Sequence, residues 1–154
     1  MKKLIKSFQY AGRGIRYCLR NERNMRIHLI ASVYVLIFSL FFSLSSLQYA
    51  VLVLLIALMF SAEMINTAIE TLVNLVSPCY HQLARIAKDV AAGAVFVCAA
   101  AAVLIGLLFF WKPEVYPAIV RFFADRPWCL LLLAASMVFS LLFIFKGPDR
   151  LVKR

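Results

Sequence analysis

Residues 47–76, LQYAVLVLLIALMFSAEMINTAIETLVNLV, decide the fold of this chain. The first 16 residues of the stretch carry no charge, whereas the remaining 14 mix acids and amides with apolar residues. A helix that crosses the hydrocarbon core of a bilayer needs about 20 predominantly apolar residues. The stretch therefore predicts a membrane-spanning helix that is longer than the bilayer core requires and polar at its C-terminal end.

The polar residues at that end follow a helical period. Glu63, Asn66, Glu70 and Asn74 are spaced by three, four and four residues, which places them on one side of a helix. An isolated charge at the bilayer centre costs about 2.5–3.5 kcal/mol on insertion scales, and two carboxylates on one face also repel each other. Oxygen ligands of this kind suit Mg²⁺, which would relieve the repulsion. We interpret the stripe as a functional site; pairing of the acids with a neighbouring helix is the simpler alternative.

Further apolar runs predict further spans. No charged residue occurs from 27 to 62, a run too long for one span, and Ser45 and Ser46 within it predict a turn. Of the 154 residues, 64% are hydrophobic, which is more apolar surface than a water-soluble domain of this size can bury. We therefore expect an all-α membrane protein with spans at about 27–44, 47–76, 86–111 and 128–145.

The first 22 residues have a different pattern. Leu4, Phe8, Ala11, Ile15 and Leu19 recur at helical spacing, and basic residues fill most of the other positions. Such a basic amphipathic helix is suited to the surface of an anionic membrane. We expect a surface helix over 1–22, although the pattern alone is equally consistent with a simple anchor.

The placement of charge predicts the orientation. The formal net charge is +10, and Lys and Arg lie mainly on one side of the expected spans, fourteen against three. Because cytoplasmic segments carry the excess of Lys and Arg, both termini of this multi-pass protein should be cytoplasmic. Nucleic-acid binding is a poor alternative, since the basic residues flank spans and form no separate basic domain.

A second polar set opens the expected third span. Lys88 and Asp89 would enter the membrane from the same side as Glu70 and at a similar depth. A cation and a further carboxylate beside a carboxylate pair are typical of a phosphate and metal site. Flanking positive charge would explain Lys88 but not Asp89. Glu22, the one acid among residues 1–62, could join the site, although a solvated surface residue is the simpler interpretation.

Three segments carry a resemblance to a known family: 21–24 (NERN), 63–70 (EMINTAIE) and 87–95 (AKDVAAGAV). Over roughly residues 1–111 the chain resembles the prokaryotic integral-membrane diacylglycerol kinase and undecaprenol kinase family. The resemblance implies a surface helix with three core transmembrane helices, assembled as a homotrimer whose active sites are shared between neighbouring subunits. Residues 112–154, with a fourth C-terminal transmembrane helix, would be an extension that this core does not need.

The resemblance also implies roles for individual residues. Glu63 would be the catalytic base that takes the proton from a lipid hydroxyl, and Asn66 would orient the site. Glu22 and Glu70 would bind the Mg²⁺ that accompanies ATP. The residues that would contact the nucleotide are Tyr10, Glu22, Glu70, Tyr80, His81, Lys88 and Asp89. Asn74 departs from the family, which commonly has Asp at this position, and this weakens any charge-based role there.

The resemblance favours one lipid over another. Residues 80–84 (YHQLA), followed by 87–95, look like the Gram-positive branch of the family, which is associated with undecaprenol. Undecaprenol is therefore the expected lipid alcohol, with diacylglycerol as the alternative. A small transporter or channel subunit, or a structural protein, remains open from the residues alone. An ion path, however, would place polar groups through the full depth of the spans, and here they cluster at one end.

Overall fold

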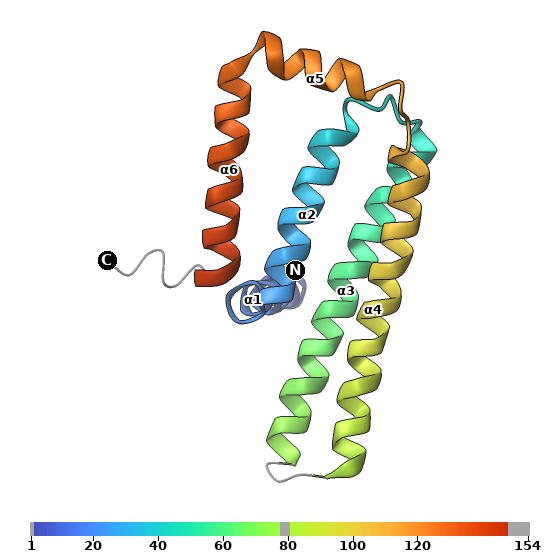
Figure 1. Cartoon of the computed structure of the whole chain (residues 1–154). Coiled ribbons are helices and arrows are strands. Elements are labelled where there is room, and N and C mark those ends of the chain that lie inside the picture. The colour runs from blue at the N-terminus through green and yellow to red at the C-terminus, as the bar shows by residue number, and fades with distance from the viewer. Residues whose placement is uncertain (1, 78–80, 148–154) are drawn as a thin grey trace, which may run out of the picture.

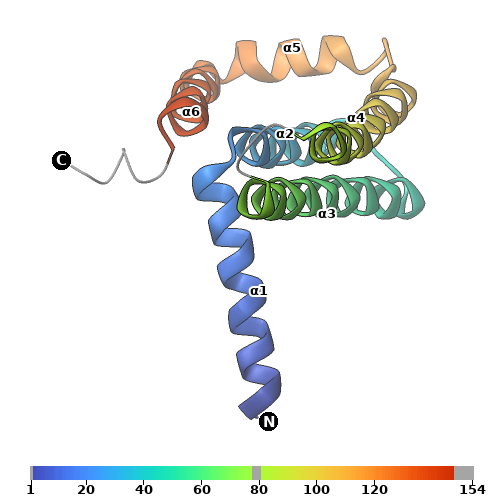
Figure 2. The same cartoon turned by 90° about the horizontal axis from the view of Figure 1, so that it is seen from below.

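The computed structural model describes residues 2–77 and 81–147, and in these ranges it contains six helices and no strand. The all-α fold expected from the sequence is confirmed. Four helices run roughly alongside one another, and α5 crosses one end of them (Figure 1). Helix α1 leaves the other end of α2 nearly at a right angle, and the hairpin of α3 and α4 continues beyond that point (Figures 1 and 2). The helices are α1 (Lys2–Asn21), α2 (Arg23–Ser39), α3 (Ser46–Val76), α4 (Gln82–Phe110), α5 (Tyr116–Asp125) and α6 (Pro127–Lys146).

The turn expected at 45–46 is the N-terminal cap of α3. The Ser45 hydroxyl accepts from the Gln48 amide at 3.3 Å, and the Gln48 side chain accepts from the Ser45 amide at 2.9 Å. This reciprocal pair satisfies two backbone donors that would otherwise lack partners at the start of the helix. Local chemistry therefore fixes where α3 begins.

The expected span 27–44 differs from the structure. The helix ends at Ser39, and the chain then turns through Ser43, which has a positive φ of 46°. With 17 residues, α2 is about 26 Å long, somewhat shorter than a hydrocarbon core of about 30 Å. In the described part of the chain, the helices long and apolar enough to cross a membrane are α3, α4 and α6. The 31-residue α3, at about 46 Å, is longer than that core.

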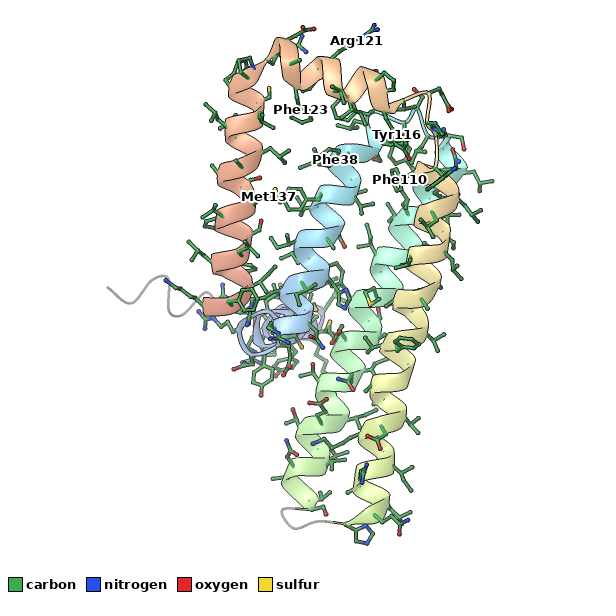
Figure 3. All side chains as sticks on the ribbon, in the orientation of Figure 1. Phe38, Phe110, Tyr116, Arg121, Phe123 and Met137 are labelled. Atoms are coloured by element: carbon green, nitrogen blue, oxygen red, sulfur yellow. The ribbon has the colours of Figure 1, made fainter. Side chains whose placement is uncertain are left out.

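A compact core lies where α5 crosses the bundle. Phe42, Leu44 and Leu52 are buried there, and the rings of Phe42 and Phe110 meet edge to face at 5.0 Å. Figure 3 shows Phe110 and Tyr116 at this junction of α4 and α5. Elsewhere, most large apolar side chains of the long helices are exposed. An apolar exterior of this extent is typical of helices whose solvent is lipid.

The C-terminal helix packs against α2 through polar contacts. The Tyr34 hydroxyl lies 2.9 Å from the Ser136 hydroxyl and 3.2 Å from that of Ser140. Hydroxyl pairs between helices hold them together in an apolar surrounding, where few other partners exist. These contacts fix the side of α2 that α6 covers.

A buried arginine joins three helix ends. Arg26, which is 6% exposed, donates from Nε to the carbonyl of Ile144 at 3.1 Å. Its Nη1 donates to the carbonyls of Leu19 at 3.1 Å and Arg20 at 2.9 Å. The last carbonyls of a helix lack partners within the helix, so one guanidinium satisfies groups at the ends of both α1 and α6.

Candidate active site

The candidate site lies at the corner where α1 gives way to α2, beside α3. Glu22 is the residue at this corner, with extended backbone angles and an amide that donates to the Cys18 carbonyl at 2.8 Å. Burial raises the pKa of Glu22 above its ordinary value. The negative charges of Glu70 and then Glu63 raise this pKa further, and Arg26 opposes the shift. The Glu22 carboxylate therefore senses the two carboxylates of α3, and a cation among the three would relieve the repulsion.

Asn66 and Glu70 form the part of the site that best fits a metal. Asn66 Nδ2 donates to Glu70 Oε1 at 3.0 Å, while Asn66 Oδ1 is buried without a hydrogen-bond partner. A buried oxygen without a partner beside carboxylates is a ligand set that suits Mg²⁺. The residues the structure describes form no cluster of three or more His, Cys, Asp or Glu ligands. Asn66 Oδ1 and the Glu70 carboxylate would supply part of a Mg²⁺ coordination shell, and Mg²⁺ commonly takes its other ligands from water or phosphate.

Glu63 is buried and paired with a residue that the sequence analysis missed. The residue is 2% exposed, and Oε1 lies 3.1 Å from His28 Nε2 on α2. Thr67, one turn further along α3, donates its hydroxyl to the Glu63 carbonyl at 2.9 Å. His28 lies in the run 27–62, which contains no charged residue when histidine is counted as neutral. An imidazole inside an apolar helix is itself a signal of function, and that signal could have identified it.

An apolar groove starts at His28. It lies among α2, α3 and α4, with a volume of about 350 Å³, and extends from His28 toward Phe110. His28 and Ser32 are its polar lining residues, one turn apart on α2, and the remainder of the lining is apolar. The Ser32 hydroxyl donates to the His28 carbonyl at 2.7 Å. The groove is therefore polar at the end next to Glu63 and apolar along its length, as an amphiphilic ligand is.

The second polar set lies further along the α3–α4 hairpin. Lys88 Nζ donates to Asn74 Oδ1 at 3.4 Å. Asn74 is the position at which the family commonly has Asp, so the lysine here contacts a neutral amide. Arg85 and Asp89 form an exposed pair one turn apart at 3.6 Å. Neither Lys88 nor Asp89 is joined by a hydrogen bond or ion pair to the corner carboxylates.

The remaining predicted nucleotide contacts are also apart from the corner. Tyr10 is exposed on α1, with the Arg13 guanidinium 4.6 Å from the centre of its ring, and α1 projects away from the bundle (Figure 2). His81 caps α4, accepting from the Leu83 amide at 3.3 Å. Tyr80 lies outside the described residues. One chain therefore brings together Glu22, Glu63, Asn66 and Glu70. Lys88 contacts Asn74, one turn beyond Glu70, whereas the contacts described for Tyr10, His81 and Asp89 are with other residues.

Comparison with known proteins identifies the class as that of membrane lipid kinases. The chain is 46% identical over 110 residues to the undecaprenol kinase of Bacillus subtilis, covering 71% of this chain and 89% of that protein. It is 44% identical over 104 residues to a diacylglycerol kinase of Synechocystis, covering 67% of this chain and 59% of that protein. It is 26% identical over 110 residues to the diacylglycerol kinase of Escherichia coli strain K12, covering 71% and 90%.

A family model described as prokaryotic diacylglycerol kinase matches residues 9–110, and the chain belongs to this family. The resemblance found in the sequence is thus confirmed, and the protein is a lipid kinase. This membership decides against the transporter, channel and structural alternatives. The matched residues end at the last residue of α4, so α5 and α6 lie beyond the part of the chain that the family model describes.

Proposed function

We infer that this lipid kinase transfers the γ-phosphate of ATP to the hydroxyl of undecaprenol, with Mg²⁺, at the cytoplasmic face of a bacterial inner membrane. The observation that carries the proposal is the buried Glu63 carboxylate, paired with His28, which lines the polar end of an apolar groove. A water-insoluble alcohol could lie in that groove with its hydroxyl at the polar end, near the proposed general base Glu63. Relatives named undecaprenol kinase and diacylglycerol kinase support the class of acceptor.

The chemistry assigned to the residues is phosphoryl transfer with general-base assistance. The lipid oxygen attacks the γ-phosphorus, the bond from that phosphorus to the bridging oxygen breaks, and ADP leaves with the bonding electrons. Glu63 accepts the hydroxyl proton as the new O–P bond forms. Glu22 and Glu70, with Asn66 Oδ1, would hold Mg²⁺. When bound, Mg²⁺ neutralises charge on the phosphates, which is most of what this reaction requires.

The identities to known kinases favour undecaprenol as the lipid. The groove volume of about 350 Å³ lies near the lower end of the 300–1,000 Å³ typical of small-molecule sites, so the groove would hold only the hydroxyl end of either lipid. The 46% identity to an undecaprenol kinase supports undecaprenol, and the 44% identity to a diacylglycerol kinase keeps the second lipid as the alternative.

A homotrimer would complete the site. Within one chain, Tyr10 lies on the projecting α1, and Asp89 pairs with Arg85 rather than with a corner carboxylate. The projecting helix also exposes Leu4, Ile5 and Phe8, which a membrane surface or a neighbouring subunit would cover. We propose that nucleotide contacts from one subunit reach the carboxylates of another. The excess of Lys and Arg on this side supports a cytoplasmic placement, where ATP is available.

The test is phosphate transfer from labelled ATP by the purified protein in mixed micelles. Undecaprenol and diacylglycerol are offered separately, each with and without Mg²⁺. We expect Mg²⁺-dependent labelling of undecaprenol and weak or no labelling of diacylglycerol. Preferential labelling of diacylglycerol would overturn the substrate assignment, and labelling that persists in a chelator would overturn the role of Mg²⁺.

A further inference from the structure

We propose that His28 is a positioning residue for the reaction: its imidazole, at the polar end of the groove, fixes the carboxylate of Glu63 behind it. This inference rests on the proposed role of Glu63 as the base. It does not depend on which lipid the enzyme accepts, because the contact lies at the hydroxyl end of the groove.

The contact joins two helices that meet at the site. His28 on α2 and Glu63 on α3 are 35 residues apart, and His28 Nε2 lies 3.1 Å from Glu63 Oε1. The Glu63 side chain is 3% exposed and that of His28 is 22% exposed. A carboxylate removed from water needs a hydrogen-bond donor, because its desolvation is otherwise uncompensated. The hydroxyl of the neighbouring Thr67 donates to the Glu63 backbone carbonyl and not to the carboxylate. His28 is therefore the residue that can supply the hydrogen-bond donor.

The position of His28 in the groove explains why the contact matters for the reaction. His28 lines the groove, whereas Glu63 lies behind it in the wall between α2 and α3. With Nε2 donating to Oε1, the contact would hold the Glu63 carboxylate in one orientation, so that Oε2 is the oxygen that would accept the substrate proton. A ring clamped in this way also shapes the end of the groove at which the hydroxyl arrives. His28 therefore acts through Glu63, and no bond of the substrate changes at the imidazole.

Positioning of this kind predicts a specific kinetic change. If the carboxylate rotates away, the proton acceptor is misplaced while the nucleotide site stays intact. A misplacement of about 1 Å can cost about 10²-fold in rate. We therefore expect His28→Ala to lower kcat by about 10²-fold with an unchanged KM for ATP. The amide of His28→Gln can donate to Oε1 from a similar distance, and it should restore most of the lost rate.

The experiment compares wild type, His28→Ala, His28→Gln and Glu63→Gln, together with the double variant His28→Ala, Glu63→Gln. Tyr34→Phe is the matched control, since it alters a polar contact on α2 that faces α6. Each variant is assayed in micelles with whichever lipid the wild type phosphorylates, and folding is followed by thermal unfolding. The wild-type rates test the proposed function, whereas the ratios among variants test His28.

The outcomes separate positioning from a structural role. We expect the loss from His28→Ala to disappear in the Glu63→Gln background, because a residue that acts through Glu63 has no effect once the base is gone. Full activity of His28→Ala would overturn the proposal. So would a folded His28→Gln as impaired as His28→Ala, or an equal loss from His28→Ala in both backgrounds.

Discussion

Replacing Glu63 by Gln isolates the chemical role of the carboxylate. The substitution keeps the size of the side chain and an oxygen that can accept from His28 Nε2, which lies 3.1 Å away. Glu63 is 2% exposed, so a neutral amide there removes a buried charge and should leave the thermal unfolding temperature unchanged or raised. General-base catalysis contributes about 10²–10⁴-fold, so we expect the rate to fall by that factor.

The size of that loss can be stated as an activation free energy. At 1.36 kcal/mol for each factor of ten, it corresponds to about 2.7–5.4 kcal/mol. The assay is initial-rate transfer of labelled phosphate to the lipid at saturating ATP and Mg²⁺, with nucleotide binding measured separately. Glu114→Gln, an exposed carboxylate in the segment before α5, is the control and should behave as wild type. Near-normal turnover by Glu63→Gln would refute the assignment of the base.

Three further predictions address the metal, the corner and the C-terminal extension. Glu70→Gln keeps an acceptor for Asn66 Nδ2 but removes a charge, so the Mg²⁺ concentration for half-maximal rate should rise at least about tenfold, since even indirect partners of a metal ligand cost 10–100-fold in affinity. An unchanged Mg²⁺ titration would contradict this. Burial raises the pKa of the Cys18 thiol, and the nearby Glu22 and Glu63 add to the shift. Maleimide labelling at pH 7–8 should then be slower at Cys18 than at an exposed cysteine introduced by Arg16→Cys, because less of the Cys18 thiol is present as thiolate. Equal labelling rates would show that Cys18 is not buried at this corner. Deleting residues 112–154 should leave measurable kinase activity, and a folded but inactive truncation would show that the extension belongs to the site.

The sequence predicted those parts of the fold that depend on local chemistry. The start of α3 was found because Ser45 and Gln48 form a cap within four residues. The end of α2 was misplaced by five residues, because residues 40–44 are as apolar as the helix before them and the turn depends on the backbone at Ser43. Helix α5 was not expected, since its ten residues depend on tertiary contacts such as that between Phe122 and Phe41, whose ring centres lie 5.2 Å apart.

Some residues of the candidate site could likewise be predicted from local sequence spacing, whereas others depend on contacts between helices. The stripe of Glu63, Asn66 and Glu70 follows from helical spacing alone, and the structure places these residues on one helix beside Glu22. The contact of Glu63 with His28 could not be found by spacing, because the two residues lie on different helices and are 35 residues apart. The buried oxygen of Asn66 likewise depends on packing that no sequence pattern describes.

The guanidinium of Arg26 couples two regions that are distant in the chain. It holds the last carbonyls of α1 and a carbonyl near the end of α6, and it lies one helical turn from Glu22. The C-terminal helix and the corner that carries a proposed metal ligand should therefore open and close as one cooperative unit. Amide protons at the end of α1 should exchange faster when α6 is removed. Substitutions at the end of α6 should change the Mg²⁺ affinity of a site to which they contribute no ligand.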